Sequence, residues 1–374
     1  MIEIESLLEA QWRDGMVPHL RYDPDFLGDY FPGPDWWPAA QGRTRLAGVP
    51  TSGITNPPVL PLAALIVGRR QPDRDQRHAF WTRVQGPLTD WLRWFLQRRR
   101  PDGISMPLTL HPWETGWDNS PRWDFLARAG LRPERGYERL DRRHVAAAER
   151  PTDRDYDSYL RLAEILDQAD YDAGAVIESS PFCVHDVVVD ALWHAGAVAV
   201  DAMAGELGTS PPFDEAELSA YRSAFGAMHW DGARNAYLDW DVNAGAPIAA
   251  ATAATAVALA GGIAEPELAA SAWRRYRELC RGAHLVPTTP PRAPEFDPGR
   301  YWRGPVWISV NWLVLKGLEQ AGLESDAAEV RSETLGLLSR EGFHEYFDAR
   351  SGEGRGIAGF TWSAALALDL LAGS

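Results

Sequence analysis

The sequence has few cysteines and no arrangement of residues typical of a metal site. Only two cysteines, Cys183 and Cys280, occur in 374 residues, which is too few for a disulfide framework, and no metal-ligand spacing surrounds them. The nine histidines are scattered, without an H-E-x-x-H motif or another paired spacing. We therefore predict that the protein holds no catalytic metal and uses no cofactor.

Long basic runs and long membrane-spanning runs are also lacking. The net charge is −15 and the longest cationic run is Arg98–Arg100, which we interpret as the solvated end of a helix, so we expect no nucleic-acid partner. The first residues do not combine a basic segment with an apolar one, so no signal peptide is predicted. The longest apolar stretch, 244–263, is rich in Ala, Thr and Gly, which favours a buried helix over a membrane span. A cytoplasmic protein without membrane partners is expected.

Tryptophan, in contrast, is abundant, with 17 residues in 374, or one in 22. Prolines mark a second regularity, because they recur where apolar segments begin, and proline is favoured in the first turn of a helix. The spacing between these starts is 55 to 66 residues, which indicates an internal repeat. The six starts lie at Pro57, Pro121, Pro181, Pro247, Pro305 and, without proline, Phe360.

Apolar segments follow these starts and alternate with amphipathic ones. Helices that are apolar all round are buried, whereas amphipathic helices expose one face. Buried helices are predicted at 59–67, 182–204, 248–260, 306–318 and 362–371, and amphipathic helices at 2–12, 75–97, 153–167, 214–227, 265–279 and 327–340. Only 235–240 resembles a strand. With a sixth inner helix expected after Pro121, six inner and six outer helices predict an all-α (α/α)6 barrel in a single domain, 1–374. A helical solenoid is the alternative, but solenoid repeats are usually shorter.

The connections that lead into the buried helices are long and rich in aromatic and acidic residues. They span 23–56, 101–121, 282–304 and 341–359, and loops of this length are usually functional. In a barrel they would lie over one mouth. Indole rings stack on the C–H faces of sugars, and cleavage of a glycosidic bond needs a pair of carboxyl groups. The alternative is that these tryptophans fill the core and the carboxylates cap helices.

Three segments in these loops resemble glycoside hydrolase family 63 and its mannosylglycerate and glucosylglycerate hydrolase relatives. They are W-E-T-G-W-D-N-S-P-R-W at 113–123, Y-W-R-G-P-V-W at 301–307, and E-Y-F with S-G-E-G and F-T-W between 345 and 362. Shorter matches near Gln11 and at 30–34 fit the short bacterial relatives. The resemblance covers nearly the whole chain, except that relatives carry a W-D loop upstream of Gln11, where this sequence has ten residues.

The resemblance implies an (α/α)6 barrel that hydrolyses α-linked sugars with inversion. The family's general acid falls on Asp118 and its general base on Glu345. In inverting enzymes two such carboxyl groups stand roughly 6.5–9.5 Å apart, with room for water. Apolar surroundings keep an acid protonated, and His344 is expected to help keep Glu345 ionised. Glu353 is the rival candidate for the base.

Further residues of the same loops are predicted to bind the substrate. Trp302 and Trp307 are expected to stack on the sugar, and Arg122 or Arg303 to bind hydroxyl groups. For Arg150, binding of an anionic leaving group such as glycerate and a plain surface position are equally open. Two acidic residues are given structural roles, Asp124 as a charge on a helix turn and Asp186 as a buried polar contact. The full predicted set is Trp36, Trp113, Glu114, Trp117, Asn119, Arg122, Arg150, Trp302, Arg303, Trp307, His344 and Glu353.

Together these features predict an inverting α-glycosidase that acts on a small α-glucoside or α-mannoside such as glucosylglycerate or mannosylglycerate. The alternative is a barrel that binds a sugar or a sugar-like metabolite without net hydrolysis.

Overall fold

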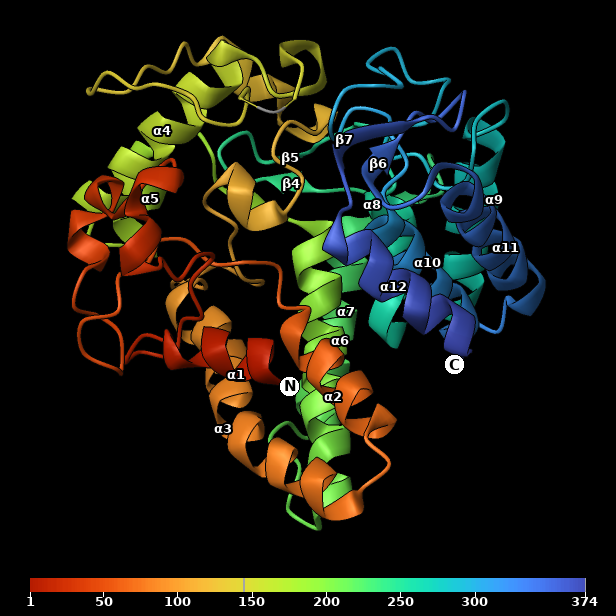
Figure 1. Cartoon of the computed structure of the whole chain (residues 1–374), viewed down its shortest axis with the longest axis horizontal. Helices are drawn as coiled ribbons and strands as arrows, with labels where there is room; N and C mark the ends of the chain where they lie inside the picture. Colours follow the sequence, from red (N-terminus) through yellow and green to blue (C-terminus); the bar gives the residue numbers. More distant parts are fainter. Residues whose placement is uncertain (144, 374) are drawn as a thin grey trace.

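The structure is a computed structural model that describes residues 1–143 and 145–373, and it is mostly helical (Figure 1). The α-helices are α1 Ile2–Glu9, α2 Leu60–Arg70, α3 Arg74–Arg98, α4 Asp153–Gln168, α5 Ala173–Ser179, α6 Val187–Leu207, α7 Glu215–His229, α8 Ala254–Val257, α9 Pro266–Leu279, α10 Ile308–Gln320, α11 Glu324–Glu341 and α12 Thr361–Ala372. The strands are β1 Val184–His185, β2 Trp230–Asp231, β3 Ala236–Tyr237, β4 Trp240–Asp241, β5 Ala246–Pro247, β6 His344–Phe347 and β7 Gly354–Ala358.

Five helices form an inner series and four others pack outside it. Along the inner series α2 contacts α6, α6 contacts α8, α8 contacts α10, and α10 contacts α12. Outside, α3 packs on α2 and α6, α7 on α6, α9 on α8, and α11 on α10 and α12 (Figure 1). The alternation of apolar and amphipathic segments therefore predicts the two layers correctly for these pairs.

Helix α6 is the longest of the inner helices, and most of its residues are buried. It begins at Val187 rather than at Phe182, because Val184–His185 pair with β4 and the Asp186 carboxylate caps the helix by accepting bonds from two backbone N–H groups. It is the one helix of the described chain that is long and apolar enough to cross a membrane, but 83% of its most apolar window is buried inside the structure. That burial is typical of a core helix.

Two of the six predicted inner helices are wrong. The segment after Pro121 forms a 3₁₀ helix, Pro121–Arg128, instead of a long α-helix. The segment 248–260 contributes only the four residues of α8, followed by a 3₁₀ turn in which Gly261 and Gly262 have φ values of 81° and 64°. A Cβ on Gly261 would lie 2.4 Å from the Cβ of Ala195, so the backbone approaches α6 too closely for any other residue.

The last helix, α12, was expected to be buried but is buried on one side only. Ala367 and Leu370 pack into the core, whereas Trp362, Leu368 and Leu371 are 61%, 70% and 69% exposed. A helix that is apolar all round thus has an uncovered face in the described part of the chain, and this burial prediction is corrected.

A β-hairpin between α11 and α12 was not predicted. Strand β6 pairs antiparallel with β7 and carries His344 and Glu345. The strand expected at 235–240 is found as two short strands, β3 and β4, which belong to two different small sheets.

Candidate active site

Asp118 lies in a loop that other parts of the chain hold on both sides. Before it, Trp117 accepts a bond at its carbonyl from Trp123 Nε1 at 3.1 Å. After it, Asn119 Oδ1 accepts from the backbone N–H of Trp302 at 3.0 Å. Both neighbours are buried, and Asp118 itself is half-buried. The loop is therefore fixed in position on either side of this carboxyl group.

The surroundings of Asp118 favour its protonated form. Burial raises the pKa of Asp118 to about 7, and the negative charges of Glu345 and Asp141 raise it further, while a backbone hydrogen bond and Arg150 oppose them. A carboxyl group with this pKa keeps its proton near neutral pH, as a general acid must.

Glu345 is 6% exposed and faces three N–H donors. Arg150 donates from Nη1 to Oε1 and from Nη2 to Oε2, each at 2.9 Å. The backbone N–H of Ile357 donates to Oε2 at 3.1 Å. A Cβ on Gly356, whose φ is 67°, would lie 2.4 Å from that oxygen, so this position of β7 needs glycine. The two carboxyl groups thus differ in their partners, because Glu345 is bonded to a cation, whereas burial is the main cause that shifts the pKa of Asp118.

Arg150 is 8% exposed, so the alternative that it is a surface arginine is wrong. Its guanidinium carbon lies 5.1 Å from the centre of the Tyr301 ring. Burial disfavours the charge, but the hydrogen bonds to Glu345 and the charges of Tyr301 and Glu345 outweigh it, so the pKa of Arg150 is raised. Its Nε has no hydrogen-bond partner.

Three of the loop tryptophans and one tyrosine stack in a series of four rings, the aromatic ladder Trp117–Trp302–Trp307–Tyr346. Ring centres are 5.4 Å apart in the first pair, 3.9 Å in the second and 5.0 Å in the third. The first two pairs are parallel to within 6°. The ladder joins the chain neighbour of Asp118 to the chain neighbour of Glu345, so much of the ring area expected to stack on sugar is covered by neighbouring rings.

Arg122 and Arg303, expected to bind sugar hydroxyls, both have carboxylate partners. Arg122 is 1% exposed and donates to Asp186 and Asp239, each at 3.0 Å. Arg303 makes a bidentate pair with Asp124 at 2.6 and 2.9 Å. The prediction that Asp186 makes a buried polar contact is confirmed. Burial raises the pKa of Asp186 to about 6 against the opposing charge of Arg122.

Glu114, which was also expected to bind the substrate, is bonded to other residues of the protein. It forms a bidentate pair with Arg99 at 2.8 and 2.5 Å, and both residues are 2% exposed. The backbone N–H groups of Leu110 and Thr55 donate to the same carboxylate. The interpretation of Arg98–Arg100 as a solvated helix end is therefore wrong for Arg99, because a loop 15 residues further along supplies a buried partner.

The remaining predicted residues fall in different places. Trp36 is buried beneath the guanidinium of Arg135, 4.0 Å from its ring centre. Trp113 is half-buried among other aromatic rings, and His344 lies on β6 beside Glu345 with an unpartnered Nδ1. The Glu353 side chain is 61% exposed and pairs with a neighbouring arginine, which disfavours it as the rival base.

Several residues of the site were not predicted from the sequence. Tyr301 lies beneath Arg150, and the Glu149 carboxylate accepts from the N–H of Gly356 at 3.0 Å. Burial is the main cause that raises the pKa values of Tyr156 and Tyr159 on α4, and the charge of Asp118 makes a smaller contribution to both. Their spacing of three residues on an amphipathic helix was a signal for a shared buried face, but it carries no information on what they face.

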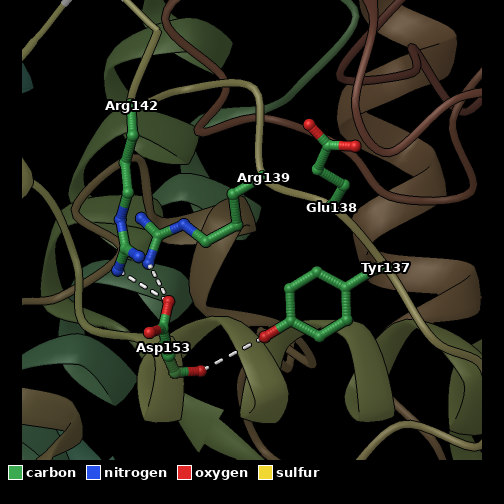
Figure 2. A pocket seen from close by; sticks show the side chains of 5 residues that line it. All are labelled: Tyr137, Glu138, Arg139, Arg142 and Asp153. Atoms are coloured by element: carbon green, nitrogen blue, oxygen red, sulfur yellow. Dashed lines mark hydrogen bonds and ion pairs between the residues drawn. The ribbon is translucent and has the colours of Figure 1, made fainter.

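Two cavities lie along this region. The larger, of about 410 Å³, is lined by Tyr137, Glu138, Arg139, Arg142 and Asp153 (Figure 2). Both arginines pair with Asp153, and Arg139 pairs with Asp141 as well, so their charge is already balanced and the cavity lacks the acid–base pair. The smaller, of about 30 Å³, is lined by residues that include Asp118, Asn119 and Tyr159, and it has the volume of about one water molecule.

Unpartnered donors are the last feature of the site. Asn119 Nδ2, Tyr159 Oη, Trp302 Nε1 and Arg150 Nε are buried without hydrogen-bond partners. Buried donors normally find acceptors, so these four atoms are available to bond to oxygen atoms of water or of a ligand. Within residues 1–143 and 145–373, no group of three or more His, Cys, Asp and Glu side chains is arranged to hold a metal ion.

Comparison with known proteins gives close relatives along almost the whole chain. The family described as the mannosylglycerate hydrolase MGH1-like glycoside hydrolase domain matches residues 1–363. The mannosylglycerate hydrolase of Thermus thermophilus is 39% identical over 96% of this chain and 86% of its own length. The glucosylglycerate hydrolase of Mycolicibacterium hassiacum is 34% identical over 99% and 86%, respectively.

Solved structures agree with these relatives. The GH63 mannosylglycerate hydrolase from a second strain of Thermus thermophilus, in complex with Tris, superposes with a TM-score of 0.90 at 36% identity, over 99% of this chain and 88% of that one. The same enzyme in complex with glucose gives a TM-score of 0.85 over 98% and 87%. The predicted all-α barrel is thereby confirmed as the fold, and the chain belongs to the MGH1-like glycoside hydrolases of family 63.

Proposed function

We propose that this glycoside hydrolase cleaves a small α-mannoside or α-glucoside with inversion, using Asp118 as general acid and Glu345 as general base. The observation that carries the proposal is the contrast between the two carboxyl groups. Asp118 is desolvated and has a pKa of about 7, whereas Glu345 faces a guanidinium and a backbone N–H. Pairs of titratable groups in opposite surroundings are typical of acid–base catalysis.

In this mechanism Asp118 gives its proton to the glycosidic oxygen while the bond between that oxygen and the anomeric carbon breaks. Glu345 takes a proton from a water molecule that attacks the anomeric carbon from the opposite face. The products are the free alcohol and a sugar of inverted configuration. Asp118 is left ionised and Glu345 protonated, and proton exchange with solvent restores the starting state.

The leaving group is proposed to be anionic, with glycerate as the first candidate. One relative is named a mannosylglycerate hydrolase and another a glucosylglycerate hydrolase. The two names differ in the sugar and share glycerate as the leaving group. Arg150 is the cation in reach of both the acid and the base, and its free Nε supports a role in binding a carboxylate. We propose a cytoplasmic location for the protein.

A direct test is release of reducing sugar from purified mannosylglycerate and glucosylglycerate. We expect turnover of at least one, and Asp118→Asn and Glu345→Gln should each lower kcat by on the order of 10² to 10⁴. Arg275→Gln on α9, which removes a solvent-exposed ion pair, is the matched control and should act like the parent protein. Binding of the glycosides without turnover would support the alternative of a sugar-binding barrel, which the hydrolase names of the relatives do not favour.

A further inference from the structure

The candidate base is engaged by the residue proposed to bind the leaving group. Oε2 of Glu345 accepts from Arg150 Nη2 and from the Ile357 N–H, and Oε1 accepts from Arg150 Nη1. An oxygen has two lone pairs, so Oε2 is saturated and Oε1 has one left. A general base must accept the proton of the attacking water at one of these oxygens. In this arrangement only one lone pair, on Oε1, is open to the water, and the guanidinium is bonded to both oxygens.

Arg150 has a second binding edge that nothing occupies. Its Nη1 and Nη2 face Glu345 end-on, while its Nε is buried and unpartnered. A guanidinium presents five N–H donors in a rigid fork and binds carboxylates in pairs of parallel bonds. The edge formed by Nε and one Nη therefore matches a second carboxylate, and the Tyr301 ring lies against one side of the group.

We propose that the Arg150–Glu345 pair is a lock that the substrate opens: a carboxylate on the leaving group takes over Arg150 and so releases Glu345 to accept a proton from water. The proposal rests on the proposed function and adds a source of specificity to it. Arg150 keeps a carboxylate partner throughout, whereas Glu345 loses its cation, keeps only the bond from the Ile357 N–H and so becomes the group that takes the proton.

The lock implies that the anion acts on turnover as well as on binding. A neutral glycoside can occupy the sugar site, but it leaves Arg150 on Glu345. Specificity for anionic leaving groups is therefore expected to be expressed in kcat, whereas a binding contact made equally in ground state and transition state would change only KM.

The test uses a substrate whose leaving group is small and uncharged before cleavage. α-Mannosyl fluoride and α-glucosyl fluoride need little help from the acid, so their hydrolysis isolates the step that depends on the base, and fluoride release is followed with an electrode. D-Glycerate, lactate or acetate is added at constant ionic strength, with chloride as the control anion. We expect the carboxylates to raise kcat for the fluoride by roughly tenfold or more, the scale of one charged hydrogen bond, and chloride to have no effect.

Variants separate the lock from general damage, because the readout is the ratio of rates with and without carboxylate for each protein. Arg150→Gln should bring this ratio to one, and Arg275→Gln on α9 should keep the ratio of the parent protein. Calorimetric titration of D-glycerate in the absence of sugar gives a readout without turnover. Binding is expected for the parent and lost in Arg150→Gln, and circular dichroism confirms that the variant is folded.

The lock is refuted if carboxylates leave the rate of glycosyl fluoride hydrolysis unchanged or lower it. A stimulation that persists in Arg150→Gln also refutes it. Failure of the proposed function has a different pattern: neither mannosylglycerate, nor glucosylglycerate, nor the fluorides are hydrolysed under any condition, while calorimetry still reports whether Arg150 binds a carboxylate.

Discussion

Replacing Asp118 by Asn should make the protein more stable in a manner that depends on pH. The folded protein holds the Asp118 proton up to pH about 7, whereas an unfolded chain releases it near 3.8. Between these values the unfolded state binds fewer protons, so the stability of the parent protein falls as pH rises. Each unit costs about 1.36 kcal/mol, so the total approaches about 4 kcal/mol. Asparagine has nearly the same shape and cannot ionise, so the unfolding free energy of the variant does not decrease with pH for this reason.

The measurement is urea unfolding of parent and variant, followed by tryptophan fluorescence at pH 5, 6, 7 and 8.5. The difference in unfolding free energy is expected to grow by about 2.7 kcal/mol in favour of the variant between pH 5 and pH 7 and to level off above pH 7. Two results would refute the reasoning that burial holds Asp118 protonated. One is an Asp118→Asn variant that is no more stable than the parent protein at any pH, and the other is a difference in unfolding free energy that does not change with pH.

Three further predictions concern the rate and the scaffold. The value of kcat/KM should fall as pH rises through about 7, because Asp118 must carry its proton to act as acid; a pH–rate profile that stays flat to pH 9 contradicts this. Trp302→Leu, which removes the middle of the aromatic ladder, should lower kcat more than it raises KM, with Trp302→Phe partly restoring kcat; equal loss in both would speak against positioning. Arg122→Met leaves two buried aspartates unpaired and should cost about 3–5 kcal/mol in thermal unfolding, whereas Arg303→Met, at a half-exposed pair, should cost about 0–1 kcal/mol.

The sequence predicts elements well where local signals and burial agree. Apolar segments after Pro57 and Pro305 became α2 and α10, which lie in the inner series. The segment after Pro121 has the same proline signal but folds as a 3₁₀ helix, since a start signal does not fix how far a helix continues. The failure at 248–260 has a packing cause, the close approach of Gly261 to α6.

The residues of the candidate site were likewise predicted only in part. The motifs identify Asp118 and Glu345 and the loops that carry them. They do not identify which carboxylate each arginine meets, because the partners are distant in sequence: Arg122 is 64 residues from Asp186, and Arg303 is 179 residues from Asp124. Residue type indicates that a cation is present, and only the fold decides whether it faces a ligand or an aspartate.

The configuration of the released sugar is the most direct test of the central claim. Proton NMR of mannosylglycerate or glucosylglycerate during hydrolysis resolves the two anomers before they interconvert. If Asp118 and Glu345 act as an inverting pair on an α-glycoside, the β-anomer appears first and the α-anomer follows by mutarotation. Initial appearance of the α-anomer would contradict the account, because it requires a covalent intermediate on one of the two carboxylates.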